Sequence, residues 1–518
     1  MSLEDIRHVV ILMQENRSFD HYLGTLGGVR GFADREALVL PDGGSVFRQP
    51  SPGGRLLPYR LDSSRYSAQH AEELPHDRDT GHQAINDGAM NGWVAAKGPR
   101  TMGYFTREDI PYQYALSDAF TTCDAYFCSQ AGPTDPNRLF LWSGTSGPFT
   151  DNSVVTGNPL ADWTTYAERL HEAGVSWRVY HNPDGEDERE GDYDCNGLSY
   201  FRQFHAFPPD DPRHVNAMTR WDLTAFDQHC KDGTLPAVSW LVSPFLSCEH
   251  PAASPAYGAD WVNTALQSLF ANPEVWRHTV FLLMYDENDG WFDHVVPPFP
   301  PAGTPDEFVD GRPKGLGNRV PLWVISPWSR GGWVNSQVFD HTSVLRFLEL
   351  VTGVAEPNIS AWRRAVCGDL TSCFDFDRPD FTVPELPDTK ALVRLADAAA
   401  SLPAVPLPVP VPPDSPLALP AQEPGNRPRR PLPYAPGAEI TVDRATGIVT
   451  CTLTNGGSVA FHYTVFPRTH FPFRGTPFTV APGATAAYTW DTELTGGTYD
   501  FTVHGADGFV RRFSGTTQ

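Results

Sequence analysis

The sequence predicts an α/β fold built on a central, mostly parallel sheet, followed by a small C-terminal all-β sandwich domain. Two observations lead to this prediction. Over residues 1–401, short continuous apolar runs alternate with helical patterns, whereas over 436–518 Thr, Val, Phe and Tyr alternate with polar residues. Continuous apolar strands between helices are typical of a sheet covered on both faces, and period-two alternation is typical of an antiparallel sandwich.

Three continuous apolar runs predict buried strands in the first part, at residues 8–13, 281–285 and 321–325. Residues 402–435 are so rich in proline that they predict a stiff, extended linker without regular structure. In the tail, Gly-containing turn signals recur between the alternating runs, as expected for short antiparallel strands. The sequence therefore predicts three segments: 1–401, the linker 402–435, and 436–518.

The chain of 518 residues is strongly acidic, with 39 Lys and Arg against 62 Asp and Glu and a net charge of −23. Such a surface argues against nucleic acid as a partner and against non-specific docking on anionic lipid, because both need basic residues. The acidity has two readings at this point. It could be an ordinary solvated surface, or some of the carboxylates could gather around a cation.

No apolar run reaches the roughly 18 residues that a membrane-spanning helix needs, so no transmembrane segment is expected. The N-terminus has no charged region followed by a long apolar run, and no twin arginine, so we expect a cytoplasmic protein as the chain stands. The eight cysteines include no Cys-x-x-Cys and suggest scattered buried thiols. Cys367 and Cys373 are near enough in sequence to pair, as are Cys123 and Cys128.

Carboxylates follow two of the predicted strands. Glu15 and Asn16 come after the strand 8–13, and Asp286, Glu287 and Asp289 come after 281–285. Open α/β sheets build their sites at the carboxyl ends of strands, and carboxylate and amide oxygens are suitable ligands for a divalent cation. The alternatives are a helix start capped by a polar side chain and a plain acidic turn.

Thr134 lies in Gly132-Pro133-Thr134-Asp135-Pro136, where Pro136 fits a first helical position and Asp135 fits the N-cap. A helix N-terminus attracts anions such as phosphate, and a metal-bound hydroxyl there can act as a nucleophile. The alternative is a threonine that only caps the helix. His76, His250 and His341 could neutralise phosphoryl charge or protonate a leaving group, although each alone is more often structural.

Five segments in this order resemble the bacterial phosphocholine-preferring, non-haemolytic-type phospholipase C family. They are ENRSFDHYLG (15–24), DAFTTCDAYFCSQAGPTDPNRLFLWSG (118–144), SWLVSPFLSCEHP (239–251), YDENDGWFDHV (285–295) and VPLWVISPWSRGGWV (320–334). The family resembles a group of bacterial acid phosphatases, and both belong to the alkaline phosphatase superfamily. The resemblance implies an alkaline-phosphatase-like catalytic phosphoesterase domain at 1–401 and the family's C-terminal β-sandwich at 436–518. It also implies that relatives are often secreted or periplasmic.

The resemblance further implies a covalent phospho-enzyme mechanism at one divalent metal ion, which could be Ca, Mg, Mn or Zn. The implied metal ligands are Glu15, Asn16, Thr134, Asp286 and Glu287. Thr134 is the implied nucleophile, His76, His250 and His341 are the implied phosphate-contacting histidines, and Asn196 and Asp289 are expected near the substrate. The expected reaction splits phosphatidylcholine-like lipids into diacylglycerol and a phosphorylated headgroup. The alternatives are an acid phosphatase acting on soluble phosphate esters and a non-catalytic surface-binding protein.

Overall fold

The first domain is built around a central sheet. The computed structural model describes residues 1–154, 160–183 and 191–517 of the chain. Within these residues the sheet has seven strands in the order β13-β6-β12-β9-β1-β8-β7. Their bounds are β1 His8–Gln14, β6 Thr121–Cys123, β7 Trp177–Tyr180, β8 Val238–Leu241, β9 Thr279–Tyr285, β12 Leu322–Ile325 and β13 Val334–Asn335. Only β12 runs antiparallel to its neighbours, so the prediction of a mostly parallel sheet is confirmed.

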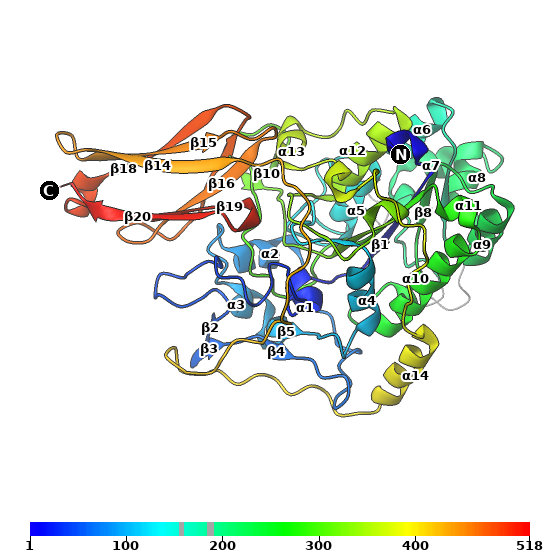
Figure 1. The fold of residues 1–518 in the computed structure, drawn as a ribbon, viewed down its shortest axis with the longest axis horizontal. Helices are drawn as coiled ribbons and strands as arrows, with labels where there is room; N and C mark the ends of the chain where they lie inside the picture. Colours follow the sequence, from blue (N-terminus) through cyan, green and yellow to red (C-terminus); the bar gives the residue numbers. More distant parts are fainter. Residues whose placement is uncertain (155–159, 184–190, 518) are drawn as a thin grey trace.

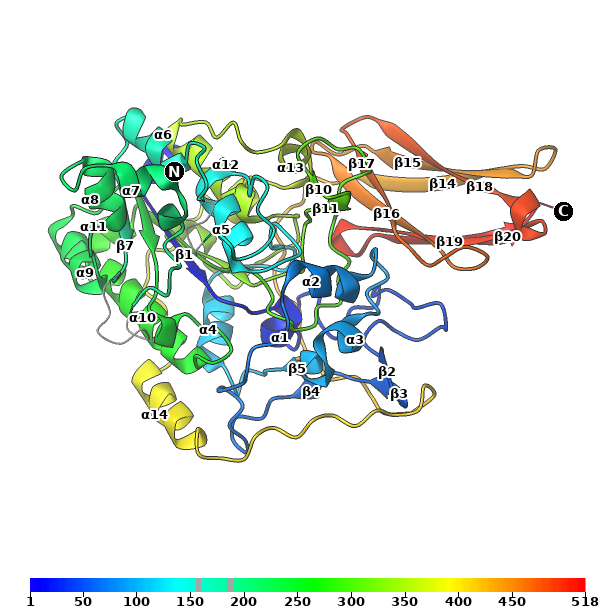
Figure 2. The same cartoon turned by 180° about the vertical axis from the view of Figure 1, so that it is seen from behind.

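Helices cover this sheet on both sides, and strand β9 is buried along its whole length (Figures 1 and 2). The helices are α1 Phe19–Leu23, α2 Arg78–Ile85, α3 Trp93–Lys97, α4 Pro111–Ala119, α5 Thr134–Ser143, α6 Tyr166–Glu172, α7 Arg202–Ala206, α8 Pro212–Met218, α9 Leu223–Asp232, α10 Pro255–Phe270, α11 Pro273–Trp276, α12 His341–Thr352, α13 Ala361–Val366 and α14 Thr389–Ala399. Short strand pairs lie outside the sheet: β2 Gln49–Ser51 with β3 Gly54–Leu56, β4 Tyr59–Arg60 with β5 Gly103–Tyr104, and β10 Phe308–Val309 with β11 Arg312–Pro313. The apolar strands predicted from the sequence therefore lie inside a covered sheet.

The C-terminal part forms two small antiparallel sheets that pack into a β-sandwich. One has the order β14-β15-β18 and the other β17-β16-β19-β20. The bounds are β14 Pro436–Asp443, β15 Ile448–Asn455, β16 Phe461–Pro467, β17 Thr476–Val480, β18 Thr485–Asp491, β19 Thr498–Gly505 and β20 Val510–Thr516. Alternate residues of β15 are buried, which is the burial that its period-two sequence predicts.

The proline-rich segment between the two parts runs along the first domain rather than through solvent, and it passes the strand pair β2–β3 in Figure 1. Val411 exchanges main-chain hydrogen bonds with Arg55, at 2.7 and 2.8 Å. Glu423 accepts hydrogen bonds from Arg107, and Arg427 donates one to Asp118 at 2.5 Å. These contacts fasten the segment to the domain.

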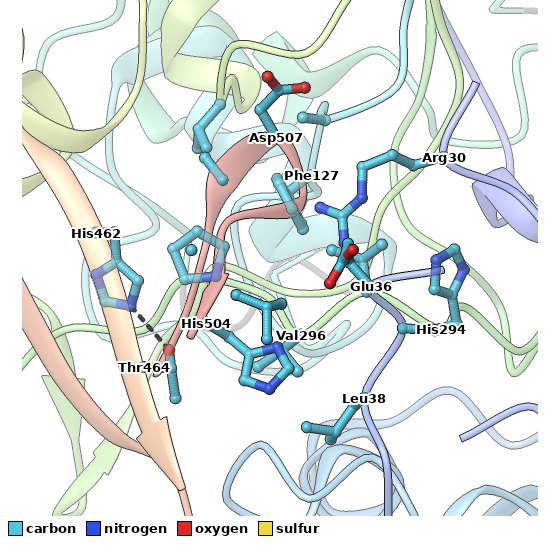
Figure 3. Close-up of a pocket in the computed structure, with 18 residues that line it drawn as sticks. Arg30, Glu36, Leu38, Phe127, His294, Val296, His462, Thr464, His504 and Asp507 are labelled. Atoms are coloured by element: carbon cyan, nitrogen blue, oxygen red, sulfur yellow. Dashed lines mark hydrogen bonds between the residues drawn. The ribbon is translucent and has the colours of Figure 1, made fainter. Parts of the chain in front are cut away.

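The β-sandwich meets the first domain around a small cavity of about 50 Å³ (Figure 3). His462 and His504 line it from the sandwich, and Arg30 and His294 line it from the first domain. Burial lowers the pKa of His462 to about 3 and that of His504 to about 4. Within the described ranges 1–154, 160–183 and 191–517, no helix is long and apolar enough to cross a membrane.

The cysteines, all of which lie in the described part of the chain, are free and buried. Neither sequence-adjacent pair forms a disulfide in this structure. The sulfur that lies next to Cys123 Sγ is instead that of Cys373, at 3.6 Å. The interpretation of scattered buried thiols is therefore confirmed, and the contact between Cys123 and Cys373 arises because the fold brings strand β6 and residue 373 together.

Candidate functional site

The candidate site lies where four parallel strands end. Glu15 and Asn16 follow β1, Asp286 and Glu287 follow β9, the segment after β8 leads to His250, and the segment after β6 leads to Thr134. These four strands point the same way, so their carboxyl ends meet at one edge of the sheet. The fold therefore brings together side chains that lie up to about 270 residues apart, as the hydrogen bond between Asn16 and Asp286 illustrates.

Asn16, Asp286 and Glu287 each present an oxygen without a hydrogen-bond partner. The Asn16 main-chain N–H donates to Asp286 Oδ1 at 2.9 Å, and its side-chain amide donates to Asp289 Oδ1 at 3.2 Å. Among the described residues nothing bonds to Asn16 Oδ1, Asp286 Oδ2 or Glu287 Oε1, although all three side chains are buried. Buried unpaired oxygens are costly, and a bound divalent cation is a partner that suits all three.

The carboxyl groups of Asp286 and Glu287 lie in a buried environment with like charges nearby. Burial raises the pKa of Asp286 well above its usual range, and the nearby Glu15 raises it further. Burial also raises the pKa of Glu287, with Asp286 and Asp289 adding to the effect. Like charges gathered in a buried place disfavour ionisation unless a cation compensates them. The donor set therefore fits a metal ion that prefers oxygen ligands.

Glu15 differs because it already has a cationic partner. Arg138 Nη2 contacts Glu15 Oε1, and Arg138 Nε lies 3.7 Å from Asp286 Oδ2. Burial would raise the pKa of Glu15, but Arg138 and His250 outweigh it and hold the pKa below its usual range. Cys195 Sγ also donates to Glu15 Oε1, at 3.0 Å.

Sequence reasoning missed Arg138 and Lys97. Arg138 could have been found, because it lies four residues after Thr134 on α5 and therefore on the same helix face. Lys97 had no such signal. Its ammonium donates to Thr80 Oγ1 at 2.9 Å, and burial lowers its pKa to about 8 against the opposing influence of Glu287 and Asp77.

Thr134 is the first residue of α5, and Pro133 rather than Asp135 is the N-cap. The predicted cap was therefore wrong by two residues. Pro136 is tolerated as the third helical residue because the N–H groups of the first turn have no partner within the helix. The Thr134 hydroxyl has no hydrogen-bond partner among residues 1–154, 160–183 and 191–517. A cavity of about 490 Å³, lined by Pro133 and His76, opens beside it.

Asn137 fixes the loop that carries Thr134. Its Oδ1 accepts from the Gln130 main-chain N–H at 2.9 Å, and its Nδ2 contacts the carbonyls of Gln130, Gly132 and Pro133 at 3.2, 3.2 and 3.0 Å. Asn137 is fully buried. One side chain therefore satisfies four main-chain groups immediately before the candidate nucleophile.

His76 and His250 lie beside each other, with ring centroids 6.4 Å apart. His76 Nδ1 lies 2.7 Å from the Leu74 carbonyl and 3.3 Å from Asp289 Oδ1. Both neighbours are acceptors, so Nδ1 carries the hydrogen and Nε2 is left for other partners. His250 Nε2 lies 3.3 Å from Glu73 Oε2, and burial lowers the pKa of His250 despite the opposing influence of Glu15.

Two predicted site residues have other contacts. His341 is fully buried, and its two ring nitrogens contact Tyr126 Oη and the Asp286 carbonyl, both at 2.7 Å. It therefore supports the segment that carries Asp286 from behind. Asn196 caps a short 3-10 helix, Gly197–Tyr200, and donates to the Ala217 carbonyl at 2.8 Å. A residue type alone could not distinguish these supporting positions from substrate contacts.

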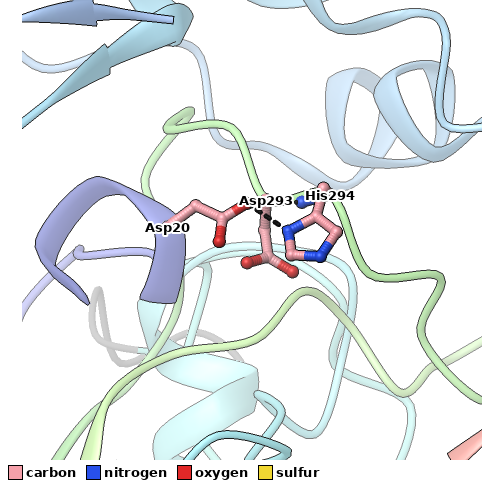
Figure 4. Close-up of side chains that lie close together, drawn as sticks. All are labelled: Asp20, Asp293 and His294. Carbon is pink, nitrogen blue, oxygen red and sulfur yellow. Dashed lines mark hydrogen bonds and ion pairs between the residues drawn. The ribbon is translucent and has the colours of Figure 1, made fainter. Parts of the chain in front are cut away.

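In a second group of side chains, the possible ligand atoms lie close enough together to hold a metal ion. Asp20, Asp293 and His294 offer ligand atoms that lie within 4.8 Å of one another (Figure 4). Arg319, however, already donates to Asp20 at 2.9 Å and to Asp293 at 2.8 Å. Its guanidinium compensates both carboxylates, whereas Asn16, Asp286 and Glu287 each keep one buried oxygen without a hydrogen-bond partner. A cation would therefore stabilise the group at the strand ends more than it would stabilise Asp20, Asp293 and His294.

Two family models match the chain. Residues 6–355 match the phosphoesterase family, and residues 428–516 match the C-terminal domain of bacterial phospholipase C. A non-hemolytic phospholipase C from Pseudomonas aeruginosa is 45% identical over 99% of this chain and 77% of the relative. A hemolytic phospholipase C from the same organism is 42% identical, over 99% of this chain and 78% of the relative.

More distant similarities extend beyond these bacteria. A non-specific phospholipase C3 from Arabidopsis thaliana is 27% identical over 74% of this chain and 77% of that protein. A solved protein of the alkaline phosphatase superfamily from Vibrio parahaemolyticus aligns with a TM-score of 0.30 and 14% identity, over 58% of this chain and 81% of that one.

Proposed function

Because the chain belongs to the phosphoesterase family, and within it to the bacterial phospholipases C, we propose that it is a metal-dependent phospholipase C. It cleaves the glycerol-side phosphodiester bond of phosphatidylcholine-like lipids and gives diacylglycerol and a phosphorylated headgroup. The observation that supports this best is the set of three buried, unpartnered oxygens on Asn16, Asp286 and Glu287. Contact with the lipid surface is transient in this proposal.

One divalent ion is held by Asn16, Asp286 and Glu287 in our proposal, with Glu15 and Thr134 completing the set. When bound, the ion withdraws charge from the phosphate oxygens and lowers the pKa of a hydroxyl that it contacts. Ligation by oxygen alone favours a hard cation such as Ca²⁺, Mg²⁺ or Mn²⁺ over Zn²⁺. Arg138 keeps Glu15 ionised and in place, so it is a positioning residue for this group.

Thr134 Oγ1, after losing its proton to solvent, attacks phosphorus in line as an alkoxide in the proposed first step. The Oγ1–P bond forms, and the bond from phosphorus to the glycerol oxygen breaks. The departing oxygen takes a proton from the imidazole of His250 or His76, and diacylglycerol leaves. Water then attacks phosphorus, gives its proton to the same imidazole and releases the headgroup phosphate from Thr134.

Of the two histidines, His76 is better positioned for this proton transfer. Its Nδ1 hydrogen is held by Leu74 and Asp289, so Nε2 can exchange the proton with the leaving oxygen. Asp289 orients the ring through its contact with Nδ1, as a carboxylate does beside a catalytic histidine. Asp289 is therefore a positioning residue in the proposed mechanism.

One assay separates this function from the alternatives. Purified protein, with and without a chelator, is offered phosphatidylcholine vesicles, a chromogenic phosphodiester and a chromogenic phosphomonoester. We expect chelator-sensitive turnover of the lipid and the diester. Turnover of the monoester alone would identify a phosphatase. If no substrate is turned over with any divalent ion, the chain is a non-catalytic binding protein.

A further inference from the structure

We propose that Tyr193 and Phe245, together with the Glu73 carboxylate, bind the positively charged ammonium group of the substrate headgroup. This inference rests on the proposed function and adds to it the determinant of headgroup choice. The ligand class is a phosphate ester that carries a quaternary ammonium group a few bonds from phosphorus.

Three rings form the proposed headgroup cluster, defined here as Tyr193, Phe245 and His250. The centroids of Tyr193 and Phe245 lie 4.6 Å apart, and those of Phe245 and His250 lie 5.9 Å apart. Tyr193 and His250 lie 6.3 Å apart with their planes at 62°. Since His250 also neighbours His76, the cluster adjoins the groups proposed to act on the phosphate.

The loop that carries Tyr193 is fixed to the metal-binding group. Two residues after Tyr193, Cys195 donates to Glu15 Oε1 at 3.0 Å. The main-chain N–H of Phe245 donates to the Gly191 carbonyl at 3.0 Å, which ties the two aromatic segments together. The Tyr193 ring is therefore held near Glu15, which belongs to the group proposed to act on the phosphate, as a headgroup determinant must be.

Tyr193 is held in an unfavourable conformation that exposes its ring. Its φ is 53° and that of Asp194 is 57°, both in the left-handed region that side-chain-bearing residues avoid. The Asp194 N–H donates to Asp192 Oδ1 at 3.2 Å, and Asp192 Oδ2 contacts His181 at 2.6 Å. Tyr193 is also 51% exposed, although its ring lies against those of Phe245 and His250. Strain and exposure together are typical of a functional position.

The charges around the cluster are negative. Glu73 Oε2 lies 3.3 Å from His250 Nε2, and within the described residues Glu73 forms no ion pair with Lys or Arg. A cation placed here would meet the aromatic faces of Tyr193 and Phe245 and the Glu73 carboxylate, whose contact here is with His250.

A quaternary ammonium group suits this environment better than a hydrogen-bond donor does. It carries spread positive charge and apolar methyl groups but has no N–H, so it is stabilised by aromatic faces and by nearby carboxylates. Leu246, 36% exposed beside Phe245, raises the alternative that this corner inserts into a membrane. Soluble substrates separate headgroup binding from membrane insertion.

The test compares two chromogenic phosphodiesters that differ in one atom. The first is the p-nitrophenyl ester of phosphocholine, and the second is the p-nitrophenyl ester of its neutral 3,3-dimethylbutyl isostere. The ratio of their kcat/KM values measures recognition of the positive charge. The variants are Tyr193→Leu and Tyr193→Phe. Phe471→Leu, a change at a 38% exposed aromatic residue of the β-sandwich, is the matched control.

We expect the wild-type protein to prefer the cationic ester. Tyr193→Leu should lower the preference by about 2- to 30-fold, which corresponds to the roughly 0.5–2 kcal/mol of one cation–π contact. The loss should appear mainly in KM. Tyr193→Phe should keep most of the preference because the ring face remains, and Phe471→Leu should keep all of it.

An unchanged preference in Tyr193→Leu would overturn the inference. So would a Tyr193→Leu protein that binds vesicles more weakly but discriminates the soluble esters as the wild type does, because that result identifies a membrane contact. If the wild type turns over neither ester, the proposed function fails. Calorimetric titration with phosphocholine then decides the inference separately: binding weakened by Tyr193→Leu supports it, and no binding, or equal binding, contradicts it.

Discussion

Asp289 illustrates how one carboxylate can organise the site without touching the reacting bond. Its Oδ1 contacts Asn16 Nδ2 and His76 Nδ1, and its Oδ2 accepts from the Leu74 N–H at 2.8 Å. It thereby sets which face of the Asn16 amide points to the metal group. It also sets which nitrogen of His76 is free. These two effects lead to a specific prediction for Asp289→Asn, a substitution that keeps the size of the side chain.

Asp289→Asn should lower kcat/KM for the chromogenic diester by about 10- to 100-fold, a usual cost of removing a supporting carboxylate. The amide has one accepting oxygen, so it cannot accept from Asn16 and His76 on one side and also from the Leu74 N–H on the other. Asn16 and His76 therefore lose their orientation while the fold is kept. Asp79→Asn, at an exposed ion pair with Arg312, is the control and should change little. Wild-type kinetics in the Asp289→Asn protein would exclude the positioning role.

The unpartnered oxygens predict that divalent ions stabilise the folded chain. An ion that binds only the folded state, at 100 times its dissociation constant, should add about 2.7 kcal/mol to the free energy of unfolding. Asp286→Asn should reduce this shift strongly, and Asp79→Asn should leave it in place. The measurement is the melting temperature with chelator and then with Ca²⁺, Mg²⁺, Mn²⁺ or Zn²⁺. An Asp286→Asn protein that is stabilised as much as the wild type would place the ion elsewhere, for example at Asp20, Asp293 and His294.

At the scale of elements, helix α5 and the loop before it position Thr134. Asn137 satisfies four main-chain groups of that loop while fully buried. Asn137→Ala should therefore lower the free energy of unfolding by about 2–4 kcal/mol, because buried main-chain groups lose their partners. It should also lower kcat by shifting Thr134.

Urea unfolding followed by tryptophan fluorescence measures the first effect, and the chromogenic diester assay measures the second. Asn426→Ala, at an exposed position of the proline-rich segment, is a matched control for loss of an amide side chain. The account of α5 would be contradicted if Asn137→Ala lost stability but kept full activity. Full activity would mean that the loop holds Thr134 without this side chain.

The elements were more predictable from the sequence than the roles of single residues. Strands β1 and β9 are continuous apolar runs, and the polar residues after them follow the rule for strand ends, so both could be anticipated. The start of α5 could not be fixed, because Pro133 and Asp135 both suit a helix start. His341 and Asn196 show the same limit for site residues. The His341 and Asn196 side chains form hydrogen bonds with residues of distant segments, and only the fold brings those segments close.

At the scale of the whole molecule, the β-sandwich is docked through a buried interface that contains histidine. His462 is 6% exposed, and its pKa is lowered by burial to about 3. The unfolded chain therefore binds more protons than the folded chain between about pH 3 and 6.5, so stability falls as the pH falls through this window. At pH 5 this one group should cost about 2 kcal/mol relative to pH 7.5.

His462→Gln removes this titration, so its stability should change less between pH 7.5 and pH 5 than that of the wild type. His470→Gln, at an exposed histidine of the same domain, should behave as the wild type does. Urea unfolding curves at the two pH values give the comparison. Equal pH dependence of the wild type and His462→Gln would show that His462 does not titrate as its burial requires.

Composition alone could not say which acidic residues are buried at the site and which lie on the surface, although their excess over basic residues gives the net charge of −23. The structure separates these two groups. Glu15, Asp286 and Glu287 are buried at the strand ends, whereas Glu73 is largely exposed beside the headgroup cluster. An acidic molecule of this kind should favour zwitterionic over anionic lipid, because its long-range field repels the latter. The sequence could predict the sign of this preference, but the aromatic corner that recognises the cation required the fold.

The central claim is that Thr134 carries the headgroup phosphate during turnover, and mass spectrometry of acid-quenched protein tests it most directly. With the phosphocholine ester as substrate, we expect a covalent adduct of one phosphorylated headgroup on the peptide that contains Thr134. Thr134→Ala should lack the adduct and lose activity by about 1,000-fold or more. Full turnover by Thr134→Ala, or an adduct on another residue, would contradict the account.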